Sequence, residues 1–150
     1  MVDTRDDRQV SPSSPILRTG GELPLSQLLT LYEAVGWTAY TRDPEGLARA
    51  VANSTYVVSL WEGERLVGLS RLLSDDVSIC YLQDILVHPD HQGRGLGRRM
   101  VEHCLARFAH VRQKVLLTDD EERQRRFYEA LGFRRVAEMP FSLNAYARFD

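Results

Sequence analysis

A short glycine-rich stretch, Gln92–Gly97, is the part of the sequence whose residue types and spacing most clearly indicate chemistry. Its three glycines allow a tight turn and let the backbone come close to a ligand. An apolar segment, Ile85–Val87, precedes it, and an amphipathic segment follows. Unpaired backbone N–H groups and the positive end of a helix would then face one point, an arrangement that binds phosphate.

Basic residues around this stretch support a phosphate ligand. From Arg94 to Lys114, five arginines and one lysine stand against one glutamate, a local charge of +5. The glycine spacing matches neither common nucleotide motif, since a P-loop needs Gly-x-x-x-x-Gly-Lys-Ser/Thr and the dinucleotide fingerprint needs Gly-x-Gly-x-x-Gly. The sequence therefore predicts a phosphate-bearing ligand held in another way.

Asp84 is the candidate proton acceptor, because it interrupts the apolar segment before the glycines. A carboxylate among Leu82, Ile85 and Leu86 is costly unless it is paired. Two roles are open: a general base that deprotonates an amine, or a structural partner of an arginine such as Arg71.

The cysteines and histidines predict neither a disulfide framework nor a metal site. Cys80 and Cys104 are isolated, and the role of a small buried apolar residue suits both. Histidines 88, 91, 103 and 110 show no paired spacing with thiolate or carboxylate ligands. We expect reduced thiols, no metal and a cytoplasmic protein.

Apolar periodicity locates the elements that must position these residues. We expect helices over 24–35, 43–53, 97–109 and 121–131, a loop over 37–42, and strands over 16–18, 55–61, 66–73, 77–87, 111–117, 133–137 and 143–149. The order β-α-α-β-β-β-α-β-α-β-β predicts an α/β (or α+β) fold built on a mixed sheet.

Length and composition restrict the class of protein. A chain of 150 residues that is 43% hydrophobic and 27% charged suits one globular domain. No apolar run reaches the roughly 18 residues of a membrane span, and the net charge of −2 argues against a general nucleic-acid binder. Residues 1–15 are polar and predict a flexible tail before a single domain over 16–150.

Two motifs resemble one enzyme family. Gln92-x-x-Gly95-x-Gly97 resembles the Gln/Arg-x-x-Gly-x-Gly/Ala signature of GCN5-related N-acetyltransferases (GNAT), and the preceding Val87–Asp90 resembles the family's usual strand end. Phe127–Phe133 resembles its second hallmark, and the element order matches over roughly residues 16–149. The resemblance implies a mostly antiparallel central sheet flanked by helices. It also implies transfer of an acetyl group from acetyl-CoA by direct attack in a ternary complex.

The resemblance also implies how acetyl-CoA is held. Its pyrophosphate would lie on the backbone amides of the glycine-rich stretch, and its pantetheine arm would pair with the preceding segment as a false strand. An amide near Ile85 would hold the thioester oxygen as negative charge develops there. The implied residues are Ile85, Leu86, Val87, Gln92, Gly93, Arg94, Gly95, Leu96, Gly97 and Arg98.

Tyr128 matches the family's tyrosine that points at the CoA sulfur, which implies a general acid for the departing thiolate. The alternative is that it packs beside Phe127 and Phe133. Where the family often has an asparagine, seven residues earlier, this chain has Glu121, which departs from the pattern.

The resemblance places the acceptor between the first two helices and the sheet, near Trp37, Tyr40, Arg71 and Tyr81. Their aromatic walls suit a small organic amine, although an amino acid, an aminoglycoside or a protein lysine also fits. We expect no nucleic-acid or membrane partner. The alternative function is a non-catalytic acyl-CoA-binding module. The alternating segment Leu143–Phe149 would either close the sheet or pair with a second chain in a homodimer.

Overall fold

The computed structural model describes residues 13–150, so most of the expected tail lies outside the described residues. The chain divides into two compact units, residues 1–115 and 116–150, which are treated separately. Within the described part, no helix is long and apolar enough to cross a membrane.

The first unit is built on a sheet in the order β1-β2-β3-β4-β5, whose first four strands pair antiparallel. Its elements are β1 (Ile16–Thr19), α1 (Leu25–Ala34), α2 (Thr38–Thr41), α3 (Pro44–Ala52), β2 (Tyr56–Glu62), β3 (Arg65–Ser74), β4 (Ile79–Val87), a 3-10 turn (Pro89–His91), α4 (Leu96–Arg107) and β5 (Gln113–Leu116), whose last residue is the first of the second unit. The mixed, mostly antiparallel sheet flanked by helices is confirmed. The expected loop over 37–42 is wrong, because it contains α2.

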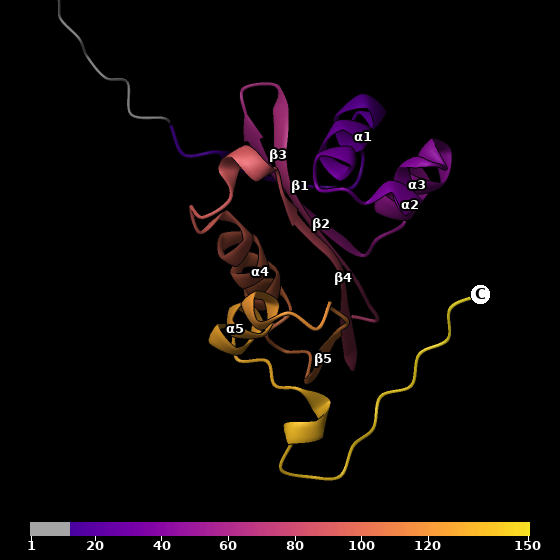
Figure 1. Ribbon diagram of the computed structural model, residues 1–150, viewed down its shortest axis with the longest axis vertical. Helices are drawn as coiled ribbons and strands as arrows, with labels where there is room; N and C mark the ends of the chain where they lie inside the picture. The colour runs from indigo at the N-terminus through magenta and orange to yellow at the C-terminus, as the bar shows by residue number, and fades with distance from the viewer. Residues whose placement is uncertain (1–12) are drawn as a thin grey trace, which may run out of the picture. The chain divides into compact units, whose positions relative to one another are not determined.

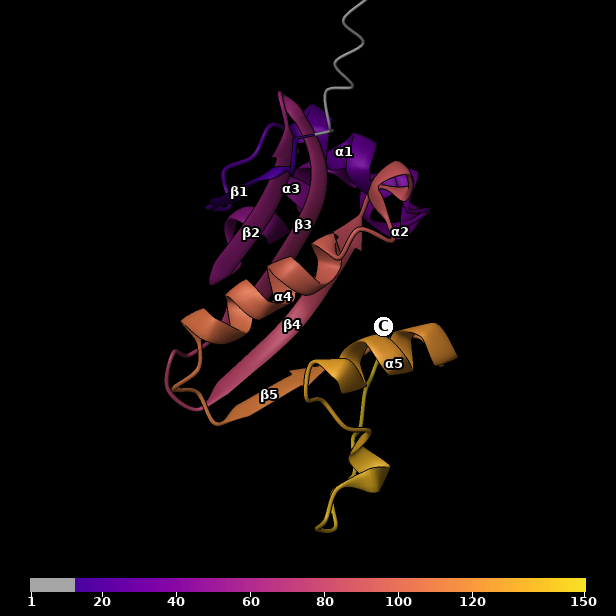
Figure 2. The same ribbon diagram turned by 90° about the vertical axis from the view of Figure 1, so that its left-hand side faces the viewer.

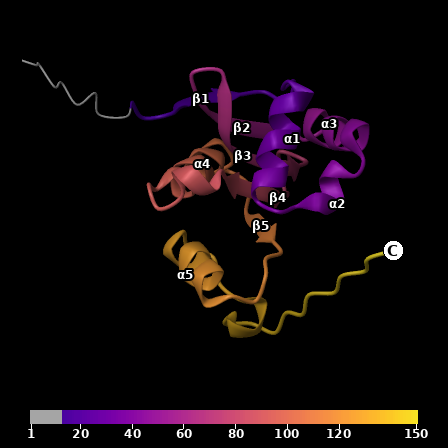
Figure 3. The same ribbon diagram turned by 45° about the horizontal axis from the view of Figure 1, so that its top comes forward.

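Helices cover the sheet on both faces, with α1 and α3 on one side and α4 on the other (Figures 1 and 3). β2 and β3 are therefore buried along nearly their whole length. Gly68 allows α4 to lie close to β3: a Cβ there would come within 3.2 Å of Cε of Met100. Leu31 and Tyr32 of α1 pack with Leu69 of β3 in the main core cluster.

A β-bulge in β4 decides which face its side chains occupy. Arg71 of β3 lies opposite Asp84, whereas the next residue, Leu72, lies opposite Leu82, so Gln83 is an extra residue in β4. Since cross-strand partners share a face, Asp84 lies with Arg71 on one face of the sheet and Leu82 on the other. Bulges of this kind are frequent beside active sites.

The second unit contains α5 (Glu122–Ala130) and a 3-10 turn (Val136–Glu138). The two strands expected over 133–137 and 143–149 are wrong, because these segments form no strand. The N–H of Phe133 donates to the carbonyl of Tyr128 (3.1 Å) and closes the end of α5. A strand also needs a neighbouring strand for its backbone groups. The alternating side chains Leu143 and Phe149 stay 48% and 87% exposed.

Candidate functional site

Within residues 13–150, β3 is the one strand that pairs with the second half of β4. β5 begins beside Ser78, whose carbonyl accepts a hydrogen bond from the N–H of Gln113 (3.4 Å). β5 has four residues against nine in β4, and the two arrows point the same way (Figure 2). β5 therefore ends before the segment Gln83–Val87, and that edge of β4 is open.

The backbone groups on this open edge can be identified from the hydrogen bonds of the strand. The N–H of His88 donates to the carbonyl of Val67 (2.8 Å), so His88 faces β3. Because successive residues of a strand point their backbone groups to opposite sides, those of Ile85 and Val87 point away from β3. The carbonyl of Val87 accepts a hydrogen bond from Nε2 of Gln92 (3.1 Å). The Val87 N–H and both polar groups of Ile85 are thus positioned to pair with an added extended ligand.

The glycine-rich loop connects this open edge to α4. Gly93 and Gly95 have φ of 76° and 74°, left-handed conformations that favour glycine. Gly95 occupies the N-cap position of α4, which has no side-chain cap. The first N–H groups of the twelve-residue α4 have no partner within the helix. They lie at the positive end of its dipole, which suits an anion.

Two of the three arginines near this loop already form hydrogen bonds with other groups of the chain. Nε of Arg98 lies 2.7 Å from Oε1 of Glu102, and Nη1 of Arg99 donates to the carbonyl of Pro15 (2.7 Å). Arg94 is exposed within the loop. The backbone amides, more than the arginine side chains, are therefore the candidate donors for an anion.

Asp84 lies in a buried hydrogen-bond network on the α1 face of β4. Its carboxylate accepts hydrogen bonds from the hydroxyls of Tyr32 and Tyr40 (2.8 Å each) and from Nε of Arg71 (2.5 Å). Asp84 is 2% exposed and the Arg71 side chain 7%. The sequence left two roles open for Asp84, a general base or the partner of an arginine. The structure contains the arginine pair, which is formed with Arg71. Burial, with the Asp84 carboxylate adding to it, raises the pKa of Tyr32 and of Tyr40, so both hydroxyls remain donors.

Three aromatic rings from α1, α2 and their connection surround this network. The ring centroids of Tyr32 and Tyr40 are 5.1 Å apart, and Trp37 lies 5.9 Å from Tyr32. The guanidinium of Arg71 lies 5.9 Å from the centre of the Tyr40 ring, so the chain's own cation already contacts that ring. Nε2 of Gln83, exposed at the bulge, donates to the Tyr40 hydroxyl (3.2 Å).

Trp37, Tyr40 and Arg71, three of the expected acceptor-site residues, lie together in the structure. Tyr81 shares their face of the sheet, because its cross-strand partner Leu73 lies two positions from Arg71. It is half-buried and contributes no hydrogen bond to the network among residues 13–150. Sequence reasoning missed Tyr32 and Gln83. Tyr32 follows the apolar spacing of α1, so no signal distinguished it from a core residue.

Tyr128 belongs to the second unit and lies in α5. Its ring makes edge contacts with Phe127 and Phe133, at centroid distances of 5.0 Å and 6.0 Å. Burial raises its pKa to about 12, so the phenol carries its proton at neutral pH. Glu121 precedes α5, is exposed and makes no capping hydrogen bond with its side chain. The aromatic packing is therefore present, and it is compatible with a proton-donating hydroxyl.

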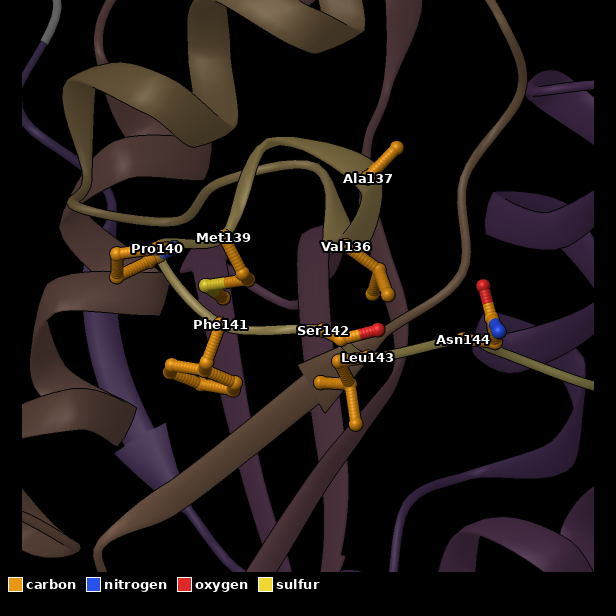
Figure 4. Close-up of a pocket in the computed structure, with 8 residues that line it drawn as sticks. All are labelled: Val136, Ala137, Met139, Pro140, Phe141, Ser142, Leu143 and Asn144. Carbon is orange, nitrogen blue, oxygen red and sulfur yellow. The ribbon is translucent and has the colours of Figure 1, made fainter.

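A hollow in the second unit contains no group that could perform acid–base chemistry (Figure 4). It is formed by the residues after α5: Val136, Ala137, Met139, Pro140, Phe141, Ser142, Leu143 and Asn144.

No cluster of three or more metal-ligating side chains occurs among residues 13–150. Both cysteines are free and buried, and burial raises the pKa of Cys104 to about 11. At neutral pH this cysteine is a thiol, which does not suit a nucleophile.

Residues 24–133 match the sequence profile of the Acetyltransferase (GNAT) family. Histone acetyltransferase TAP1 of Glycine max is 31% identical over 131 residues, covering 79% of this chain and 55% of that protein. The chloroplastic GCN5-related N-acetyltransferase 2 of Arabidopsis thaliana is 30% identical over 140 residues, covering 79% and 53%. The chain therefore spans about half the length of these relatives.

Among solved structures, a GNAT family acetyltransferase from Streptococcus pneumoniae TIGR4 is similar with a TM-score of 0.75 and 27% identity. The match covers 91% of this chain and 99% of that one.

Proposed function

The chain belongs to the GNAT acetyltransferase family, and on that premise we propose that it transfers an acetyl group from acetyl-CoA to a primary amine. The observation that carries the proposal is the open edge of β4 at Ile85 and Val87, which leads directly into the exposed glycine loop and the N-terminus of α4. An extended amide-bearing arm followed by a pyrophosphate has the chemistry that such an edge and such a loop bind.

The backbone supplies most of the donor site. The free N–H groups of residues 93–98 bind the pyrophosphate, and the Val87 N–H and the Ile85 carbonyl bind the pantetheine arm. The Ile85 N–H also stabilises the thioester oxygen when the amine attacks and that oxygen gains negative charge. These are main-chain roles, so the side chains of residues 85–87 remain available to pack against the core.

Tyr128 is proposed as the general acid. When the tetrahedral intermediate collapses, the carbon–sulfur bond breaks and the CoA thiolate takes the proton of the phenol. Because the phenol is protonated at neutral pH, it has a proton to donate to the departing thiolate. No cysteine intermediate is involved, and the acetyl group passes directly to the amine.

Asp84 is proposed as a positioning residue in place of a general base. Three donors already occupy its carboxylate, and Arg71 balances its charge. Its bonds hold Tyr40 at the bulge, where Tyr40 and Gln83 present polar groups beside the open edge. The amine proton then passes to water at this exposed point.

The acceptor is proposed to be a small-molecule amine that lies against Trp37 and Tyr40, near Tyr81. Tyr40 of α2 and Trp37, which directly precedes α2, are half-buried, so each side chain keeps a solvent-facing part. Because the Arg71 guanidinium already contacts the Tyr40 ring, we expect apolar or hydrogen-bonding groups of the acceptor, more than its charge, to contact that ring.

Isothermal titration with CoA and acetyl-CoA, followed by thiol release over an amine panel, tests the proposal. The panel contains arylalkylamines, polyamines, amino acids, an aminoglycoside and a lysine peptide. Binding with turnover of a small amine is the expected result. Turnover of the peptide alone would refute the small-molecule acceptor, and no CoA binding would refute the proposal as a whole.

A homodimer formed through Leu143–Phe149 is proposed from the alternating, exposed apolar side chains of that segment. Light scattering at high concentration tests it, and the mass of a single chain would refute it.

A further inference from the structure

The glycine loop is preceded by one buried side chain that anchors it. Among residues 88–95, only His91 is buried, with 5% exposure. Its Nε2 is hydrogen-bonded to Oε2 of Glu62, the last residue of β2. Its Nδ1 is also buried and has no hydrogen-bond partner in the described part of the chain. The Glu62 carboxylate is therefore the polar group that fixes the orientation of this ring.

The turn between β2 and β3 makes a second contact with the same segment. Arg65, which lies opposite Glu62 in the turn, has Nη2 2.9 Å from Nε2 of His88 and 3.7 Å from Oδ2 of Asp90. Both ends of the turn thus contact the residues immediately before the loop. The hydrogen bond from Gln92 to Val87 connects the next residue to β4.

We propose that Glu62 and His91 form a positioning pair that holds the glycine loop in its anion-binding conformation. The inference rests on the proposed function. Gly93 and Gly95 have wide conformational freedom, and ordering them upon binding would reduce affinity. An anchored His91 fixes the backbone one residue before Gln92, so the loop amides converge before the ligand arrives. Neither side chain needs to touch the ligand.

The charge of Glu62 makes the proposal testable by the direction of an effect. The hydrogen bond to His91 is the largest contribution that lowers the pKa of Glu62, and the nearby charges of Arg94 and Arg65 lower it further. Glu62 is therefore a carboxylate in the neighbourhood of a loop that binds a polyanion. If charge alone mattered, removing it would strengthen CoA binding. If it positions the loop, removing it weakens binding.

Three variants of the full chain separate these effects: E62A, E62Q and the matched control E64A. Glu64 is exposed in the same turn, so E64A removes the same charge without removing the contact to His91. Calorimetry with CoA is expected to show about tenfold weaker binding for E62A. E62Q, whose amide oxygen still accepts from Nε2, should stay within about twofold of the wild type. E64A should bind as tightly as the wild type or more tightly.

Kinetics and hydrogen exchange distinguish the positioning role from a merely structural one, because only the positioning role predicts both of the following changes. In E62A the KM for acetyl-CoA should rise while kcat at saturation and the KM for the amine stay unchanged. Backbone amides 92–97 of the ligand-free protein should exchange faster. Removing the Glu62 carboxylate leaves Nε2 of the buried His91 without its hydrogen-bond partner, so a fall in Tm is expected and these measurements are made at a temperature where E62A is folded.

An E62A chain that binds CoA as tightly as E64A, with unchanged exchange of the loop amides, would overturn the positioning role and leave the proposed function standing. A wild-type chain that binds no CoA would overturn the proposed function, and this role with it.

Discussion

Replacing Asp84 by asparagine keeps the shape of the side chain and removes its charge. Asp84 is 2% exposed and its partner Arg71 7%, so the guanidinium would stay buried without a counter-charge. Breaking a buried ion pair in this way costs about 3–5 kcal/mol. For a chain of this length, roughly 2–4 °C of Tm is lost per kcal/mol, which predicts a fall of about 10 °C.

Thermal and urea unfolding measure this loss, and thiol release at a temperature where the variant is folded measures the effect on turnover. Because Asp84 is assigned a positioning role, the fractional loss of turnover should be the same across the alkaline range. As control, the triple variant Y32F/R71M/D84L removes both charges together with the buried Tyr32 hydroxyl that would lose its acceptor, and it should recover most of the stability, since apolar groups often replace a buried ion pair without loss.

Two results would refute this reasoning. A Tm within about 2 °C of the wild type would mean that the pair contributes little to stability. Turnover of the Asp84→Asn variant that recovers with rising pH, as the free amine becomes abundant, would restore Asp84 as the general base.

Four further outcomes are expected. Tyr128→Phe should lower turnover by roughly 10²–10⁴-fold in the thiol-release assay while calorimetry shows unchanged CoA affinity. Gly95→Ala should lower the free energy of unfolding by about 1–2 kcal/mol in urea, because the backbone is left-handed there although no atom lies within 4 Å of the new Cβ. Asp75 accepts hydrogen bonds from the hydroxyl of Ser78 and the N–H groups of residues 77–79, and these lower its pKa. Its contribution to stability is therefore present above the unfolded-state pKa and lost as the pH falls through the lower folded-state pKa, so Asp75→Asn should flatten the acid side of a Tm–pH curve. Asp43→Ala removes the N-cap of α3, whose carboxylate accepts from the Gly46 N–H (2.9 Å), and should cost about 1 kcal/mol by thermal unfolding.

Much of the fold could be predicted from local residue patterns. Apolar periodicity located α1, α3, α4, α5 and the first five strands, because burial of one helix face or of a whole strand leaves its period in the sequence. The pair Asp43-Pro44 marked the start of α3, and the structure has the cap and the first-turn proline there. The glycine loop could also be identified from the sequence, because the left-handed backbone at Gly93 and Gly95 favours glycine at these positions.

The end of the chain shows the limit of periodicity. Alternation over Leu143–Phe149 predicted a strand, but a strand forms only where a neighbour takes up its backbone hydrogen bonds. That neighbour is not a property of the segment, so its sequence could not decide whether the strand would form.

The network around Asp84 was decided by tertiary structure alone. With strict alternation, Leu82 and Asp84 would lie on one face of β4, and the extra residue Gln83 places them on opposite faces. Nothing in the residue types marks this bulge, because it arises from the register between β3 and β4. The same holds for Tyr32 and for the contact between Glu62 and His91, which join residues 52 and 29 positions apart. The sequence by itself determined the position of the glycine-rich loop between a strand and a helix. Packing determined that Glu62 contacts His91 and that Arg71 neutralises Asp84, because both contacts join distant segments.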